Sequence, residues 1–139
     1  MEGLLVEWQP VVVASAMMAL DVVTGFAGAA KSKAVASGKM REGLWHKAGF
    51  FGLILLAFAY ETAAALVNIE AGSAGLGVAV PELPAVSGAC VFVVATEAVS
   101  VCENLCVLNP EIARLPGIRA IKRHGGGADS DGGQGKGRE

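Results

Sequence analysis

Four carboxylates lie inside stretches of the chain that are otherwise apolar: Asp21, Glu61, Glu97 and Glu103. An Asp at the centre of a membrane helix costs about 2.5–3.5 kcal/mol, whereas each Leu, Ile, Phe or Val returns only about 0.3–0.6 kcal/mol. Carboxyl groups in such surroundings bind protons, accept hydrogen bonds or pair with cations. We therefore predict that all four are functional intramembrane groups, together with four neighbours on the same helix faces: Thr24, Gly25, Ser100 and Asn104. The alternative for Asp21 and Glu103 is a position near the membrane surface.

Three apolar stretches position these acids, at residues 11–30, 48–69 and 85–108. Each reaches the roughly 20 residues that a helix needs to cross a bilayer. The chain has 139 residues, 53% of them hydrophobic and 17% charged, which is too apolar for an ordinary soluble domain. The sequence therefore predicts an all-α membrane protein with three transmembrane helices. The alternative, a soluble three-helix bundle, requires wide polar faces at helical spacing, which these stretches lack.

The Lys and Arg residues are confined to two segments of the chain. None of the eleven lies in residues 1–30 or 48–113, whereas five lie in 31–47 and six in 114–139. Because segments rich in Lys and Arg stay on the cytoplasmic side, this distribution predicts an external N-terminus and a cytoplasmic C-terminus. The residues that we expect to set this topology are Lys31, Lys33, Lys39, Arg41, Lys47, Arg114, Arg119, Lys122 and Arg123.

The segments between the predicted helices follow from this topology. Residues 1–10 form an external N-terminus, 31–47 a basic cytoplasmic loop, and 70–84 an external loop rich in Gly and Pro. Residues 109–139 form a basic cytoplasmic tail, which we expect to be largely disordered because almost no apolar residue follows Ile121. The chain is thus predicted to cross the membrane three times, N-out and C-in.

Each predicted helix has one face on which its acid lies among small or polar residues. At 100° per residue these faces contain Ala14, Asp21, Thr24, Gly25 and Gly28; Ala57, Glu61, Ala64, Ala65 and Asn68; and Thr96, Glu97, Ser100, Glu103 and Asn104. A single three-helix protomer is expected to offer the acids no basic partner within the membrane. We therefore expect them to be protonated, hydrogen-bonded to Thr, Ser and Asn, or exposed to water in an assembly.

No group of residues in the sequence has the pattern of a catalytic, cofactor or metal site. The three cysteines, Cys90, Cys102 and Cys106, form no CxxC pair and are expected to be small packing residues. No candidate nucleophile has a His base nearby, and no Gly-rich loop carries the Lys and Ser or Thr of a phosphate-binding loop. The sequence thus predicts a protein that is not an enzyme, uses no cofactor and binds no nucleic acid.

Three motifs together resemble a known family. They are DVVTGFAGA at residues 21–29, SGKMREGLWHKAG at 37–49 and TEAVSVCEN at 96–104, whose E-x-x-S-x-x-E-N pattern is the most specific. Through them, residues 15–110 resemble the bacteriophage holin family that includes the toxin-secretion and phage-lysis holins. The resemblance implies a protein that oligomerises in the bacterial inner membrane and opens lesions. Such lesions release a cell-wall hydrolase (endolysin) or another cytoplasmic cargo, which causes timed lysis or protein export.

Two other functions remain open on the residues alone. A small proton-coupled carrier subunit also places a Glu at mid-membrane among small residues, and it would show ion flux without killing the cell. A non-lytic oligomeric scaffold would use its acids only for helix association. The expected partners are further copies of the chain, the lipid bilayer and, for a holin, a cell-wall hydrolase.

Overall fold

The computed structural model describes residues 8–33 and 37–118. It contains three long helices and one short 3-10 helix: α1 (Trp8–Lys31), α2 (Ser37–Ser73), α3 (Ala85–Leu108) and η2 (Ile112–Arg114). Each of the three long helices is long and apolar enough to cross a membrane. The described residues contain no strand, so the predicted all-α fold with three membrane-spanning helices is confirmed.

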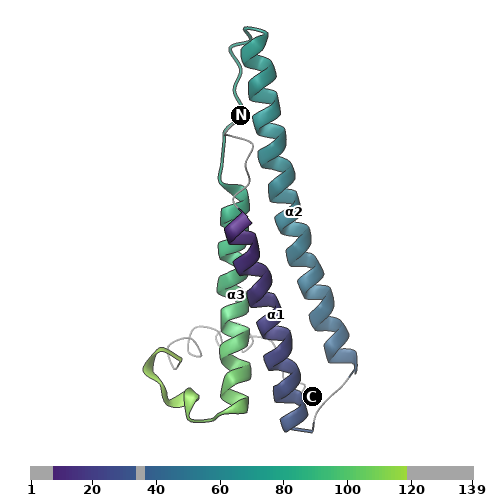
Figure 1. Cartoon of the computed structure of the whole chain (residues 1–139), viewed down its shortest axis with the longest axis vertical. Coiled ribbons are helices and arrows are strands. Elements are labelled where there is room, and N and C mark those ends of the chain that lie inside the picture. Colours follow the sequence, from purple (N-terminus) through teal and green to yellow (C-terminus); the bar gives the residue numbers. More distant parts are fainter. Residues whose placement is uncertain (1–7, 34–36, 119–139) are drawn as a thin grey trace, which may run out of the picture.

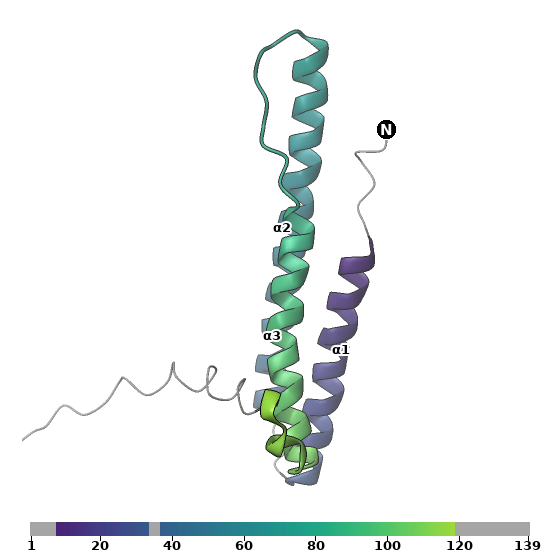
Figure 2. The same cartoon turned by 90° about the vertical axis from the view of Figure 1, so that its left-hand side faces the viewer.

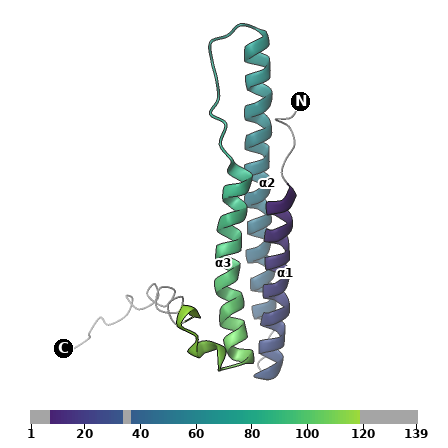
Figure 3. The same cartoon turned by 60° about the vertical axis from the view of Figure 1, so that its left-hand side comes forward.

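The three helices form an elongated bundle in which α2 runs opposite to the other two (Figure 1). Helices α1 and α3 lie side by side in the same direction, and α1 packs mainly on α3 (Figure 3). Helix α2 contacts α3 and hardly touches α1. We name the two ends of the bundle after residues: α1 and α3 finish at the Lys31 end, and α2 finishes at the Ser73 end. Helix α2 extends well beyond its neighbours at the Ser73 end (Figure 2).

Two glycines allow α1 and α3 to approach closely. A Cβ atom at Gly28 would lie 3.6 Å from Cγ1 of Val107, and one at Gly25 would lie 3.3 Å from Nδ2 of Asn104. In a membrane, where lipid is as apolar as a helix surface, such close contacts between small residues supply much of the association energy. The pair α1 and α3 is therefore the tightly packed part of the bundle.

Lys31 joins the same two helices at their ends. Its Nζ donates hydrogen bonds to the carbonyl oxygens of Leu108, at 2.6 Å, and Val107, at 3.2 Å. The last carbonyls of a helix have no partner within the helix and carry partial negative charge, so a Lys side chain stabilises them. Lys31 thus fixes the axial position of α1 relative to α3.

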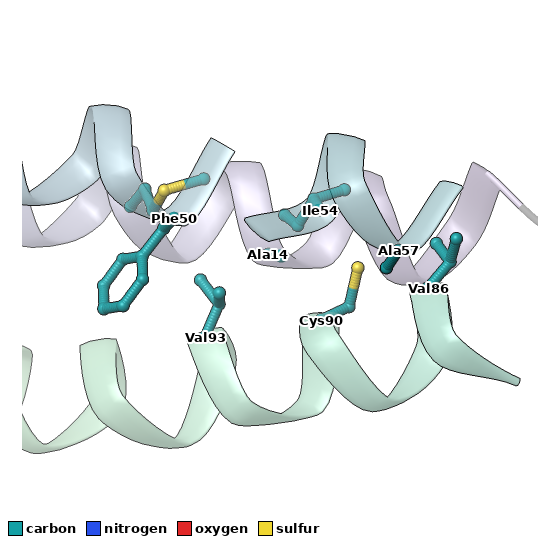
Figure 4. Packing of buried hydrophobic residues seen from close by; sticks show 8 residues of the cluster. Ala14, Phe50, Ile54, Ala57, Val86, Cys90 and Val93 are labelled. Carbon is teal, nitrogen blue, oxygen red and sulfur yellow. The ribbon is translucent and has the colours of Figure 1, made fainter. Parts of the chain in front are cut away.

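The apolar core lies in the half of α1 and α3 nearest the Ser73 end, and all three helices contribute to it (Figure 4). Its buried members are Ala14, Met18, Phe50, Ile54, Ala57, Val86, Cys90 and Val93. Most of these side chains are small or medium in size, which suits the narrow space between three helices. The Cys90 side chain points toward α2, close to Ile54 and Ala57 (Figure 4).

Helix α2 has a regular line of buried and half-buried residues. Its members alternate at spacings of three and four residues: Lys47, Phe50, Ile54, Ala57, Glu61, Ala64, Asn68 and Ala71. This spacing is the heptad pattern, which keeps one face of a helix against its neighbours over many turns. We name this line the α2 stripe. Its first half faces α1 and α3, and its second half lies in the part of α2 that extends beyond them.

The loop at residues 74–84 runs back along this extended part of α2 and is fastened to it (Figure 2). The side-chain amide of Asn68 pairs with both backbone groups of Val80, donating to its oxygen at 2.9 Å and accepting from its nitrogen at 2.7 Å. The Tyr60 hydroxyl donates to the carbonyl oxygen of Pro81 at 2.7 Å. These bonds satisfy backbone groups of an irregular segment that has no sheet or helix partner.

The helix bounds differ from the predicted segments at several places. Helix α1 begins at Trp8, inside the predicted N-terminal segment 1–10, and α2 ends at Ser73, inside the predicted loop 70–84. Helix α2 begins at Ser37, so most of the basic segment 31–47 is helical, because a helix satisfies its own backbone outside lipid as well as inside it. Of the predicted tail, residues 109–118 are described and contain η2. The remaining predicted topology residues, Arg119, Lys122 and Arg123, lie outside the described residues, as does the rest of the tail.

Candidate functional site

Lys47 of α2 lies between carboxylates of the other two helices. Its Nζ donates to Oδ2 of Asp21 at 2.9 Å and to both oxygens of Glu97, Oε1 at 2.8 Å and Oε2 at 2.7 Å. The side chains of Lys47, Asp21 and Glu97 are 11%, 19% and 3% exposed. One ammonium group thus connects all three membrane-spanning helices through buried ion pairs.

The position of Lys47 follows from the α2 stripe. Lys47 is its first member, three residues before Phe50 and seven before Ile54, and residues at these spacings share one face of a helix. The expectation that a single protomer offers the acids no basic partner is therefore wrong. It treated Lys47 only as a topology signal in a loop, whereas α2 begins ten residues earlier and turns Lys47 inward. The heptad spacing from Lys47 into the apolar stretch was the signal that could have revealed this.

Asn104 and Thr24 complete the polar surroundings of Asp21. Asn104 Nδ2 donates to Oδ1 of Asp21 at 2.9 Å and lies 3.4 Å from Oγ1 of Thr24. The Thr24 hydroxyl donates to the carbonyl oxygen of Leu20 in the preceding turn, at 2.9 Å. Among the described residues, no buried side-chain nitrogen or oxygen lacks a hydrogen-bond partner. We name Asp21, Thr24, Lys47, Glu97 and Asn104 the bridge cluster.

The charges of the bridge cluster do not balance. Two carboxylates face one ammonium group, so the fully ionised cluster carries a net charge of −1. A buried ion pair repays the cost of removing charges from water only when its geometry is good and its remaining polar atoms are satisfied, and both conditions hold here. Removal of one partner leaves the others as uncompensated buried charges. Chemically, the cluster can act as a latch between helices, and one added proton would make it neutral.

Glu61 lies apart from the bridge cluster. Its Oε1 accepts a hydrogen bond from the backbone N–H of Val86 at 2.9 Å, in the first turn of α3. The first N–H groups of a helix have no partner within the helix and attract negative charge, so a carboxylate stabilises this end. Because Glu61 follows Lys47 by fourteen residues, it lies about 21 Å further along α2. The structure therefore does not bring Glu61 together with Asp21 and Glu97.

Two predicted site residues of α3 stay outside the bridge cluster. Ser100 is half-buried and Glu103 is exposed, and neither side chain forms a hydrogen bond with any described residue. The predicted polar face of α3 therefore divides, with Glu97 and Asn104 turned toward α1 and α2 and Glu103 turned away. The functional roles assigned to these residues stay predictions.

A comparison with protein-family models gives a match over nearly the whole described chain. The model of the bacteriophage holin family matches residues 2–115, which include all three membrane-spanning helices and the bridge cluster. The chain belongs to the bacteriophage holin family. The resemblance seen in the sequence is thereby confirmed. No curated protein and no solved structure compared with the chain matches it.

Family membership and the three apolar helices identify this holin as a multi-pass membrane protein. The family has a general role as phage holins and is typically non-enzymatic. The described residues of this holin include no group of three or more His, Cys, Asp or Glu side chains that could hold a metal ion. The contacts that the bridge cluster forms are ion pairs and hydrogen bonds between helices.

The Lys and Arg residues that the structure describes fall into three groups. Lys47 belongs to the bridge cluster, and Lys31 holds the end of α3. Lys33, Arg41 and Arg114 are exposed, and Lys39 lies in the first turns of α2. Most of the exposed basic residues gather at the Lys31 end, which agrees with a common side for both basic segments. The direction in which the bundle crosses the membrane stays a prediction.

Proposed function

We propose that this chain is a holin of the bacterial inner membrane that assembles with further copies of itself and opens lesions. The lesions release a cell-wall hydrolase or another cytoplasmic cargo, and the result is timed lysis or protein export. The family match supports the class of function. The observation that carries the proposal is the bridge cluster, because it places charged groups inside the membrane-spanning part of the bundle and satisfies them there.

The bridge cluster allows the three-helix bundle two arrangements, one with the Lys47 bridges closed and one with them open, which differ in how much charge they expose. While Lys47 is bound, both carboxylates lie between helices and are paired, and many exposed side chains of the three helices are large and apolar, which suits packing in lipid. When the bridges open, Asp21 and Glu97 require water, because an unpaired charge in hydrocarbon costs several kcal/mol. Copies that open together can then line an aqueous lesion with these groups. A difference of a few kcal/mol between the two arrangements is enough for such a transition.

The proposed orientation places the Lys31 end on the cytoplasmic side. The described basic residues support it, because Lys31, Lys33, Arg41 and Arg114 all lie in the segments that border this end. In this orientation, α1 begins on the external side, and the loop at residues 74–84 lies beyond the external ends of α1 and α3.

The experiment is inducible expression in a bacterium that also carries a cytosolic cell-wall hydrolase. Membrane potential and culture turbidity are followed together, and cells without the hydrolase serve as the control. We expect an abrupt loss of potential after a delay in both strains, and lysis only in the strain with hydrolase.

Other outcomes would contradict the proposal and identify the alternative. Normal potential and growth despite membrane accumulation would favour a scaffold. Cation-dependent flux across the membrane without cell death would favour a carrier subunit.

A further inference from the structure

The apolar stretches of the three helices are not level with one another. Asp21 is the fourteenth of 24 residues in α1 and Glu97 the thirteenth of 24 in α3, so both lie near the middle of their helices. Their partner Lys47 is only the eleventh of 37 residues in α2. The middle of the apolar stretch of α2, at Phe58, lies eleven residues further on. At 1.5 Å per residue, α2 is displaced by about 17 Å toward the Ser73 end.

No single position of a bilayer can cover all three apolar stretches in this arrangement. The hydrocarbon layer is about 30 Å thick. If it is centred on α1 and α3, it covers α2 only from about Ser37 to Ala57 and so includes the exposed, charged Arg41 and Glu42. The second half of the α2 apolar stretch then lies outside the hydrocarbon layer.

The part of α2 that projects beyond the other helices has an apolar surface. Leu66 and Ile69 are 54% and 62% exposed, and Leu76 and Val78 of the adjoining loop are 61% and 67% exposed. Burial of such side chains in lipid is favourable in proportion to their area. The displaced position of α2 thus leaves apolar surface without cover, and the bridges of Lys47 oppose the movement that would cover it.

The α2 stripe allows α2 to move along its own axis by whole heptads. Because its spacing repeats every seven residues, a shift of fourteen residues places one half of the stripe where the other half was. Glu61 then takes the place of Lys47, Ala64 that of Phe50, Asn68 that of Ile54, and Ala71 that of Ala57. This shift of about 21 Å is the whole number of heptads closest to the observed displacement.

The connections of α2 permit a movement of this size. Six peptide units join Lys31 to Ser37, and a fully extended chain of that length spans about 20 Å. Opening of the first turn of α2, which contains Gly38, adds further length at low cost because glycine is a poor helix former. At the other end, residues 74–84 already run back along α2. The movement shortens the distance they cover once the hydrogen bonds of Tyr60, Glu61 and Asn68 to residues 80–86 have broken.

We propose that the Lys47 bridges hold α2 in its position displaced toward the Ser73 end. When the bridges open, α2 slides two heptads toward the Lys31 end. This inference rests on the proposed function and names the movement behind it. After the slide, Lys47 has left the centre of the bundle and Glu61 faces Asp21 and Glu97. Three carboxylates without a cation then share one site, which requires water or protons. Smaller side chains also replace Phe50 and Ile54, so the bundle has more room for water.

Native Cys90 provides a reporter of register. In the bridged arrangement it lies in the core beside Ala57 (Figure 4). After a two-heptad slide, Ala71 occupies that place. The variants Ala57→Cys and Ala71→Cys, oxidised in membranes, therefore report the bridged and the shifted register through a disulfide to Cys90. Cys102 and Cys106 are first replaced by Ala, so that Cys90 is the one native cysteine left. Cleavage after Glu82 then separates both new cysteines from Cys90, so joined fragments identify the disulfide. The same chain without a new cysteine gives the background.

We expect that opening the bridges exchanges one disulfide for the other, so that Cys90 pairs with position 71 instead of position 57. With the bridges intact, Ala57→Cys joins Cys90 and Ala71→Cys does not. With Lys47→Met, the Ala57→Cys product falls several-fold and the Ala71→Cys product appears. The double variant Asp21→Asn with Glu97→Gln opens the bridges from the other side and should give the same reversal, even if Lys47→Met accumulates poorly. Lys33→Met, a matched change at an exposed lysine, should leave the pattern of the parent chain.

The outcomes separate this inference from the proposed function. An unchanged disulfide pattern in both bridge variants overturns the slide, and loss of membrane potential in the same cells would still support a holin. If the bridge variants exchange the two disulfides in cells that keep their membrane potential, the slide is supported and the proposed opening of lesions is overturned. If Lys33→Met exchanges the two disulfides to the same extent as Lys47→Met, the Lys47 bridges do not hold α2 in place.

Discussion

Replacement of Lys47 by Met tests the central element of the site. Met keeps most of the length and apolar volume of the Lys side chain and removes its charge and its three hydrogen bonds. The ion pairs are only 3–19% exposed, so they belong to the class of buried pairs and not to surface pairs that contribute at most about 1 kcal/mol. Loss of one member of a buried pair costs about 3–5 kcal/mol, because the remaining charge stays buried without a partner.

This free energy predicts the size of the effect. Each 1.4 kcal/mol changes an equilibrium tenfold, so Lys47→Met should favour the opened arrangement by about a hundredfold to a few thousandfold. In a population that triggers when enough copies have opened, lysis should begin earlier than in the parent. The assay is the time between induction and the loss of membrane potential, at matched membrane accumulation of the two proteins.

A triple variant supplies the matched control. Lys47→Met combined with Asp21→Asn and Glu97→Gln removes all three charges while keeping the shapes of the side chains. Because no uncompensated charge remains, most of the lost stability should return and the onset of lysis should move back toward that of the parent. If Lys47→Met and the triple variant both trigger at the time of the parent, buried charge does not control opening and the reasoning fails.

Three further predictions concern the parts around the bridge cluster. Gly28→Leu places side-chain atoms against Val107 and should separate α1 from α3 at a cost of about 1–3 kcal/mol, seen as a lower unfolding temperature in detergent; an unchanged temperature would contradict the close packing. Asn68→Leu removes both hydrogen bonds to Val80, at about 1 kcal/mol each, so a protease should cleave the loop at residues 74–84 faster. Equal cleavage would show that the loop is not held there. Glu61→Gln keeps an oxygen that can accept the hydrogen bond at the start of α3, so folding should be unchanged while the timing of lysis shifts; parent timing would argue against a role in the opened state.

The apolar spans could be predicted from the sequence because their cause is local. A stretch of about 20 apolar residues has no better environment than a bilayer, whatever its neighbours are. The faces of the helices were also predictable, since 100° per residue places Asp21 beside Thr24 and Gly25, and Asn104 beside Glu97. In the structure, Thr24, Gly28, Ala57 and Ala64 are buried.

The site itself depended on two quantities that composition and periodicity leave open. One is the rotation of each helix, which turned Glu97 inward and left Glu103, six residues away, exposed. The other is the axial position of α2, which placed Lys47 between Asp21 and Glu97 and left Glu61 about 21 Å away. Hydropathy alone would have set the middles of the three spans level and kept Lys47 at a membrane surface. Packing among three helices fixed these positions, because contacts such as Gly28 with Val107 and the bridges of Lys47 form only between residues far apart in the chain.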